Sequence, residues 1–266
     1  MPHPASASGF RTARAAGRAR LSSDRMTNLR TVARRLKRGL YRIQHRNRPV
    51  DGDITAVSRD EWEKRAQEGE FRFHKRDRWR QTDDFMVQTD RVFRHFGFNP
   101  NDYAGKTVVD VGAGSKLRTK FFEDARLVVI EPLGDRFLAE IKGCDLKDAA
   151  EVHSRPAEQL VETLVGNADL VVSINVLDHC FDFPQIVKNI RQYLKPDGVA
   201  FLSFDMHAEA DSMHPLTLTE ESCSPIFAEA GLAIEKVTTG MGDALGGVQT
   251  YGHGPFTLNY WLRPAL

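Results

Sequence analysis

The sequence contains little cysteine: its 266 residues include three, Cys144, Cys180 and Cys223, and these form no Cys-x-x-Cys pair. An odd number of scattered cysteines argues against a disulfide framework and against a thiolate zinc site. The sequence therefore favours a reducing compartment, and we expect a cytoplasmic protein.

Long hydrophobic runs are also missing, since the sequence holds no stretch of about 18 apolar residues that could cross a membrane as a helix.

The N-terminal part has few acidic residues. Residues 1–50 carry twelve Arg and one Lys against the single acid Asp24, a net charge of +12, so the remaining 216 residues carry −11. This asymmetry indicates that the N-terminal segment and the body have different functions.

Composition and periodicity divide the chain into four segments. Residues 1–28 are rich in Ala, Ser and Arg, a composition that predicts a disordered or targeting-like tail. Alternatively, translation starts at Met26 and not at Met1, and the residues before Met26 are upstream sequence. Residues 29–48 predict a basic amphipathic helix that docks on the body or makes peripheral contact with an anionic membrane. Residues 49–103 predict an N-terminal helical cap, and residues 104–266 predict the core domain.

After Gly105, short apolar runs alternate with helical segments. Strands are predicted at 107–111, 127–130, 151–153, 170–174, 199–204, 234–238 and 256–262, and helices at 117–124, 134–142, 156–164, 184–194 and 219–230. This alternation predicts an α/β fold with a mostly parallel sheet covered by helices on both faces. Ligands of such sheets bind beyond the carboxyl ends of the strands.

The stretch VVDVGAGSKLRT, residues 108–119, ends the first predicted strand. Gly112 and Gly114 allow the backbone to approach a ligand closely, and Asp110 can accept hydrogen bonds there. The P-loop pattern GxxxxGK[ST] is absent, which argues against a phosphate loop. Glu131 ends the next strand 21 residues after Asp110, and an acid at that position can accept both ribose hydroxyls of a nucleoside.

Three further stretches extend this pattern. HSRPAEQL (153–160) follows the third predicted strand, ADLVVSINVLDHCFDFPQIVKNIRQYLKPDG (168–198) contains the fourth, and LTLTEESCSPIFAEAGL (216–232) contains the last helix. Together with VVDVGAGSKLRT they resemble class I S-adenosylmethionine-dependent methyltransferases, and NVLDH is similar to the small-molecule and glycan branch. The resemblance covers about residues 105–262. It implies a Rossmann-like seven-stranded, mostly parallel sheet with a C-terminal β-hairpin, preceded here by a helical extension.

The resemblance also implies S-adenosyl-L-methionine as the cofactor and a set of residues that hold it. These are Asp110, Gly112, Gly114, Glu131, Pro132, Arg155, Pro156, Ala157 and Asn175. Lys116 stands where the family often has a third small residue. Its side chain either folds away from the cofactor or reaches the methionine carboxylate.

The candidate catalytic residues are His179, Asp178, His207 and His214, which follow the fourth and fifth predicted strands. The ordinary pKa of a histidine lies near neutrality, which suits a base for a hydroxyl nucleophile. Each of these residues can instead cap a helix or line the pocket. Asp178, Asp205 and His207 as metal ligands are the less favoured alternative, and no metal is predicted. Asp182 is predicted to cap the following helix.

The aromatic and basic run FRFHKRDRWR, residues 71–80, has two interpretations. Phe71, Phe73, His74 and Trp79 either form a lid or acceptor wall, or belong to a helix with a solvated basic face and a buried aromatic one. The sequence does not decide between them.

The resulting prediction is methyl transfer to a hydroxyl of a small molecule or glycan, lipid-linked if the 29–48 helix binds a membrane. The alternatives are an RNA methyltransferase using the basic arm, an NAD-dependent oxidoreductase, and a non-catalytic cofactor-binding protein. RNA or DNA base methylation is disfavoured because the sequence after the fourth strand reads NVLD, without an NPPY-like tetrapeptide or a Pro-Cys pair. An NAD-dependent oxidoreductase also has glycines after the first strand and an acid after the second strand that binds the ribose hydroxyls. The sequence predicts no oligomeric state.

Overall fold

The computed structural model describes residues 59–76, 83–206, 214–240 and 257–265. The chain divides into two compact units, residues 1–51 and 52–266, and every described residue lies in the second. The predicted tail (1–28) and basic helix (29–48) therefore lie outside the described residues. Among the residues that are described, no helix is both long and apolar enough to span a bilayer.

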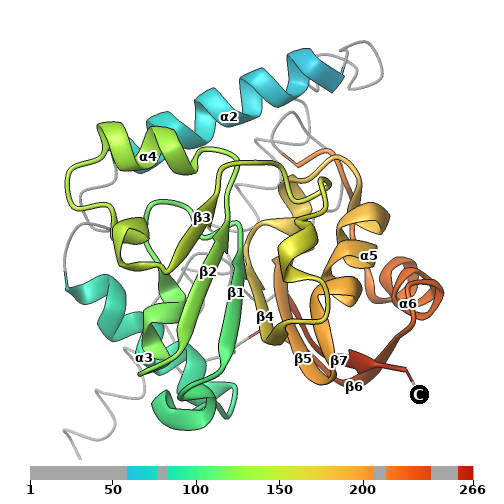
Figure 1. The fold of residues 1–266 in the computed structure, drawn as a ribbon. Helices are drawn as coiled ribbons and strands as arrows, with labels where there is room; N and C mark the ends of the chain where they lie inside the picture. Colours follow the sequence, from blue (N-terminus) through green and yellow to red (C-terminus); the bar gives the residue numbers. More distant parts are fainter. Residues whose placement is uncertain (1–58, 77–82, 207–213, 241–256, 266) are drawn as a thin grey trace, which may run out of the picture. The chain divides into compact units, whose positions relative to one another are not determined.

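The described part of the chain is built on a seven-stranded sheet (Figure 1). Its strands are β1 (Thr107–Val111), β2 (Arg126–Ile130), β3 (Glu151–His153), β4 (Ala168–Ile174), β5 (Leu194–Asp205), β6 (Leu232–Thr239) and β7 (Thr257–Pro264). The order is β3-β2-β1-β4-β5-β7-β6, and β7 runs antiparallel to both of its neighbours while the other pairs are parallel. This arrangement confirms the predicted Rossmann-like fold with antiparallel C-terminal strands.

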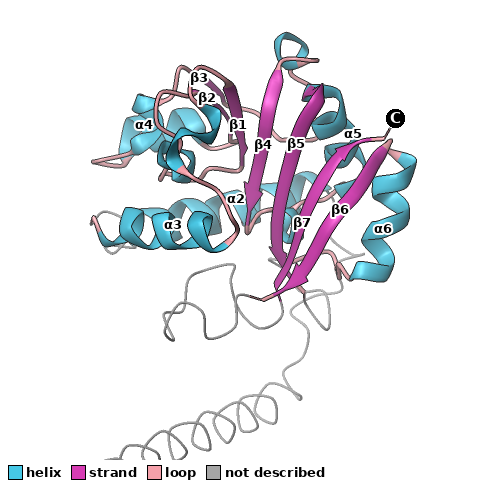
Figure 2. Cartoon of the chain, turned by 90° about the horizontal axis from the view of Figure 1, so that it is seen from below, coloured by secondary structure: helices cyan, strands magenta, loops and turns pink. Residues whose placement is uncertain are grey.

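Helices pack on both faces of the sheet (Figure 2). They are α2 (Arg59–Arg76), α3 (Asp84–His95), α4 (Gly134–Glu140), α5 (Phe183–Tyr193) and α6 (Glu220–Glu229). Short 3-10 turns complete the connections: η3 (Pro100–Tyr103), η4 (Arg118–Phe121), η5 (Asp145–Asp148), η6 (Glu162–Leu164) and η7 (Leu177–His179).

The two faces of the sheet form two separate apolar clusters because successive strand residues point to opposite sides. On one face Val109 packs in a cluster with α5 and α6, through Phe183 and Phe227 among others. On the other face Val108 belongs to a cluster that includes Phe93 of α3. Burial on both sides explains why the central strands β1, β2 and β4 read as continuous apolar runs and were predictable from sequence.

The start of α5 is fixed by its cap. The Asp182 carboxylate accepts a hydrogen bond from the backbone N–H of Gln185 at 3.0 Å, and Pro184 occupies the first turn. Proline fits this position because its missing N–H has no partner inside a helix. The predicted N-cap role of Asp182 is confirmed.

The helix predicted at 156–164 is wrong: this segment forms turns and the single short η6. Besides turn bonds within the segment, two of its backbone groups bond to side chains of α5. Asn189 Nδ2 donates to the Ala157 carbonyl, and the Val161 N–H donates to the Tyr193 hydroxyl. The helix predicted at 117–124 is likewise reduced to η4, where Thr119 is turned toward β1.

Candidate active site

A cavity of about 520 Å³ opens at the carboxyl ends of β1, β2, β4 and β5. The connections from β1 and β4 leave these neighbouring strands toward opposite sides, and this switch in strand order is where α/β sheets bind ligands. Its lining includes strand-end residues, the turn after β1 and one side of α2, among them Asp110, Gly112, Gly114, Glu131, Asn175, His179, His214, Glu70, Phe73 and His74.

The turn after β1 depends on two glycines in the left-handed region. Gly112 has φ +76° and Gly114 has φ +65°. A Cβ on Gly112 would lie 2.4 Å from the Val176 side chain, and one on Gly114 would lie 2.4 Å from Cε1 of His74. Both positions therefore need glycine for conformation and for space. The backbone here forms the floor of the cavity without a side chain of its own.

Glu131 is a buried carboxyl group at the end of β2. Oε2 accepts a hydrogen bond from the Gly114 N–H at 2.9 Å, and Oε1 accepts one from the Leu133 N–H at 3.0 Å. Burial raises the pKa of Glu131 to about 7. The hydrogen bonds from the two amides lower this pKa, whereas the negative charges of the nearby Glu70 and Asp110 raise it. The carboxyl group is thus held in one orientation at the cavity wall.

Asp110 is the second buried acid of the cavity, at the end of β1. Its Oδ2 accepts a hydrogen bond from the Thr119 hydroxyl at 2.8 Å. Burial raises the pKa of Asp110 to about 6, against the lowering effects of Thr119 and the nearby Arg118 guanidinium.

Lys116 points away from this cavity. Its Nζ donates to the Gly143 carbonyl at 3.1 Å and to Asp145 Oδ1 at 3.2 Å, with both side chains largely buried. Of the two expected arrangements, the structure therefore has the lysine folded away.

Asn175 follows β4 with φ +57°, and its N–H donates to the Ser203 carbonyl at 2.7 Å. Asparagine is among the few non-glycine residues that adopt this conformation readily. The other predicted cofactor residues that line the cavity are Pro132, Pro156 and Ala157. Arg155 instead has an exposed side chain and is not part of the lining.

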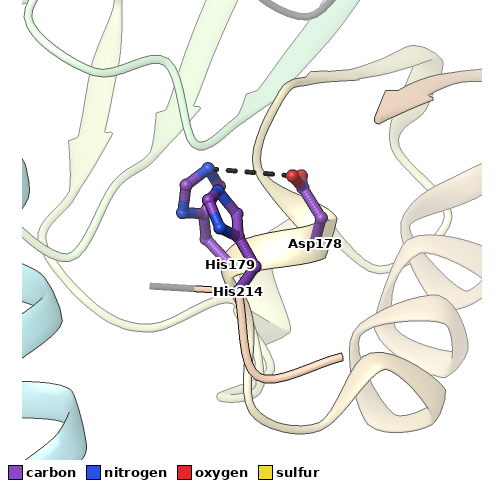
Figure 3. A group of neighbouring side chains, drawn as sticks. All are labelled: Asp178, His179 and His214. Atoms are coloured by element: carbon purple, nitrogen blue, oxygen red, sulfur yellow. Dashed lines mark ion pairs between the residues drawn. The ribbon is translucent and has the colours of Figure 1, made fainter. Parts of the chain in front are cut away.

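Three of the candidate catalytic side chains, Asp178, His179 and His214, come together (Figure 3). Asp178 and His179 lie on η7, and Nε2 of His179 is 3.8 Å from Asp178 Oδ2. The His179 ring packs against the ring of His214, with 4.3 Å between centroids. Asp178 is buried, whereas both imidazoles line the cavity.

The other acceptor-side candidates are not part of this group. His207 lies outside the described residues. Asp205 ends β5 and lines the cavity, where its Oδ1 accepts a hydrogen bond from the Thr257 hydroxyl at 2.6 Å.

Comparison with known proteins identifies the class. A family model described as a methyltransferase domain matches residues 78–235, more than half of the chain. The chain belongs to this methyltransferase family. This membership confirms the predicted class I S-adenosylmethionine-dependent methyltransferase and its cofactor.

Individual relatives of this methyltransferase are distant. The ubiquinone biosynthesis O-methyltransferase of Pseudomonas paraeruginosa is 32% identical over 104 residues, which is 38% of this chain and 44% of that protein. The chain thus spans less than half the length of the curated relatives it matches. In structure it resembles a Burkholderia thailandensis 1,6-didemethyltoxoflavin-N1-methyltransferase, with a TM-score of 0.54, 17% identity and coverage of 82% of this chain and 94% of that one. A methyltransferase from Aquifex aeolicus has the same fold at 13% identity (TM-score 0.51, covering 73% and 96%).

The residues of this methyltransferase fit S-adenosyl-L-methionine. The amides of Gly114 and Leu133 use one lone pair on each oxygen of Glu131. A carboxylate has about four acceptor sites, so each oxygen can still accept from one ribose hydroxyl. Gly112 and Gly114 both line the cavity, and its volume is within the usual range for ligand sites.

Sequence reasoning missed the direct contact between α2 and the glycine turn of the methyltransferase. Nδ1 of His74 lies 2.9 Å from the Ser115 hydroxyl, and the imidazole is buried. Phe73 also lines the cavity, whereas Phe71 stacks on Phe137 of α4 with 6.1 Å between centroids. Of these two phenylalanines, Phe73 therefore lines the cavity and Phe71 belongs to the apolar core. Trp79 lies outside the described residues.

Proposed function

We propose that this methyltransferase transfers the methyl group of S-adenosyl-L-methionine to a hydroxyl oxygen of a small molecule. One observation carries the proposal: the paired imidazoles of His179 and His214 line the same cavity as the cofactor-side residues Asp110, Gly112 and Asn175. A hydroxyl held at the imidazoles is therefore enclosed in one cavity with the cofactor.

The acceptor hydroxyl must lose its proton as the new oxygen–carbon bond forms. The chemistry that the cofactor supplies when bound is a methyl group on positively charged sulfur, whose carbon–sulfur electron pair returns to sulfur. The imidazole of His179 accepts the hydroxyl proton. The Asp178 carboxylate, 3.8 Å from His179 Nε2, stabilises the resulting imidazolium electrostatically.

The acceptor is proposed to be a small phenol or catechol, a molecule whose hydroxyl is attached to an aromatic ring. Phe73 and Phe181 lie in the cavity lining, and aromatic side chains favour contact with a planar ring. The P. paraeruginosa relative is named for O-methylation in ubiquinone biosynthesis, which points to the same reaction class. The net charge of −11 outside residues 1–50 disfavours a polyanionic nucleic acid at this cavity.

The test uses the full chain, S-adenosylmethionine labelled in its methyl group, and three acceptor sets: simple phenols and catechols, carbohydrates, and RNA. We expect label in the phenol and catechol set, detected by mass spectrometry as O-methyl products. His179→Gln should lower the rate by about a hundredfold, the usual lower bound for a general base. His95→Gln, on the exposed side of α3, is the matched control. Label only in RNA or carbohydrate would overturn the proposal.

A further inference from the structure

We propose that Asp178, His179 and His214 form a binding site for a divalent transition-metal ion of the zinc type. The site lies on the acceptor side of the cavity, so the inference rests on the proposed function and specifies how the acceptor oxygen is held. The sequence prediction included no metal, and its less favoured alternative combined Asp178 with Asp205 and His207 instead.

The geometry brings three ligand side chains from two segments to one point (Figure 3). Asp178 and His179 are adjacent on η7, directly after β4, whereas His214 comes from the segment before α6. One ligand atom from each residue can be chosen so that all three lie within 4.8 Å of one another. A tetrahedral zinc ion separates its ligand atoms by about 3.3 Å. Side-chain movements of about 1 Å would therefore bring the three ligand atoms to the separations found around a bound zinc ion.

The types of ligand select the metal. Two imidazoles and one carboxylate match the three-ligand sets of catalytic zinc sites, which leave a fourth position open. Imidazole nitrogen binds zinc and its neighbours in the transition series well, whereas magnesium and calcium prefer oxygen ligands. The set therefore favours Zn²⁺ over Mg²⁺.

Burial and ring contact support the same conclusion. The Asp178 side chain is 1% exposed, and a carboxylate removed from water is stabilised by coordination to a cation. The rings of His179 and His214 are 4.3 Å apart at their centroids. Each imidazole thus contributes one nitrogen to the group of converging ligand atoms while lining the cavity.

Asp205 is excluded from the set by its own contact. It is held by Thr257 on β7, and among the described residues it is not part of the group whose ligand atoms converge. Its place is at the cavity wall, where it can contact the acceptor directly.

The open coordination position gives the ion a function in the reaction. With the ion bound, His179 and Asp178 would be ligands, and the ion would take over the task assigned above to His179 as base. It would lower the pKa of the acceptor hydroxyl coordinated through oxygen, and the proton would pass to water as the O–H bond breaks. The oxygen anion is then held in the same cavity as the methyl group.

The experiment measures metal binding itself. The full chain is stripped with a chelator, dialysed and titrated with Zn²⁺ by calorimetry, and metal content is measured after gel filtration. We expect one equivalent of Zn²⁺ that His179→Gln and His214→Gln each weaken by more than about tenfold, since even loss of a group that only orients a ligand costs that much. His95→Gln should bind as the unmodified chain does. The visible absorption of added Co²⁺ should change in the unmodified chain and not in the two variants.

Each outcome separates the metal site from the proposed function. Equal Zn²⁺ binding by the unmodified chain and His214→Gln, or no binding by either, overturns the metal site. If phenols are still methylated in excess chelator, the proposed function stands without the metal. If Zn²⁺ binds as expected but no phenol or catechol is methylated, the metal site stands and the proposed function fails. Far-UV circular dichroism and S-adenosylhomocysteine affinity establish that both variants are folded.

Discussion

The imidazole of His74 lies directly against the α-carbon of Gly114, so helix α2 and the glycine turn after β1 fit together at the cavity wall. The contact is close enough that a methyl group on Gly114 would meet His74 Cε1 at 2.4 Å. The structure thus joins the helical segment before the sheet to the cavity lining at the turn after β1.

Gly114→Ala is therefore expected to weaken S-adenosylhomocysteine binding and to destabilise the protein. An alanine at φ +65° costs about 1 kcal/mol in conformation alone, and the clash with His74 adds to that cost. Gly105→Ala is the matched control, because Gly105 has φ +70° but nothing within 4 Å of its Cβ position. Calorimetry and urea unfolding measure the two effects. If the double variant Gly114→Ala/His74→Ala recovers no affinity, the contact is not the cause.

Cofactor binding is expected to depend on pH through Glu131. Burial raises its pKa to about 7, so the carboxylate that we propose accepts two ribose hydroxyls is present above this pH and lost below it. If only the carboxylate binds, S-adenosylhomocysteine binds about tenfold more weakly at pH 6 than at pH 8. The nearby Asp110 is a second buried acid in this pH range, since burial raises its pKa to about 6.

The assignment of this pH dependence is tested with Glu131→Gln. The amide cannot titrate, so the variant should bind weakly at both pH values with little change between them. A pH profile that persists in Glu131→Gln would assign the titration to Asp110 or another group.

Lys116 is expected to contribute to stability and not to cofactor affinity. Its ammonium is paired with Asp145 and the Gly143 carbonyl. Lys116→Met leaves Asp145 without this partner and should cost about 1–3 kcal/mol of unfolding free energy, with less than about a threefold change in S-adenosylhomocysteine affinity, which corresponds to under 0.7 kcal/mol. Asp145→Asn should show the same pattern. A large loss of affinity in Lys116→Met alone would mean that the lysine reaches the cofactor carboxylate.

The cap of α5 supports the segment that carries Asp178 and His179. Asp182→Ala should lower the free energy of unfolding by about 1 kcal/mol, the usual value of an N-cap hydrogen bond. Asp182→Asn keeps an acceptor for the Gln185 N–H and should lose much less. Urea denaturation curves of both variants provide the measurement, and equal losses would argue against the cap as the source of the effect.

The strands, the turn after β1 and the position of Glu131 in the cavity were predictable because their signals are local. A buried parallel strand is a short apolar run, and the glycines after β1 mark a turn that other residues cannot form. Glu131 is recognised by its place at the end of the next strand. The Asp182 cap is also encoded within three residues of Gln185.

Contacts between distant segments were not predictable. His74 meets Ser115 and Lys116 meets Asp145 because the fold brings those segments together, and no local pattern encodes the pairs. The same holds for His214. The sequence made both His214 and His179 candidate bases but did not predict that their rings are in contact. The helix predicted at 156–164 failed for this reason too, since bonds to α5 side chains replace helical ones.

The position of β7 has a consequence for how the chain folds. It is last in sequence among the seven strands, yet it lies between β5 and β6 and pairs with both. During synthesis β6 therefore has no partner in the sheet until residues 257–264 have emerged from the ribosome. Such late pairing between distant segments slows folding and leaves strand edges exposed. The open edge of β5 is then the surface most vulnerable to misassembly in the nascent chain.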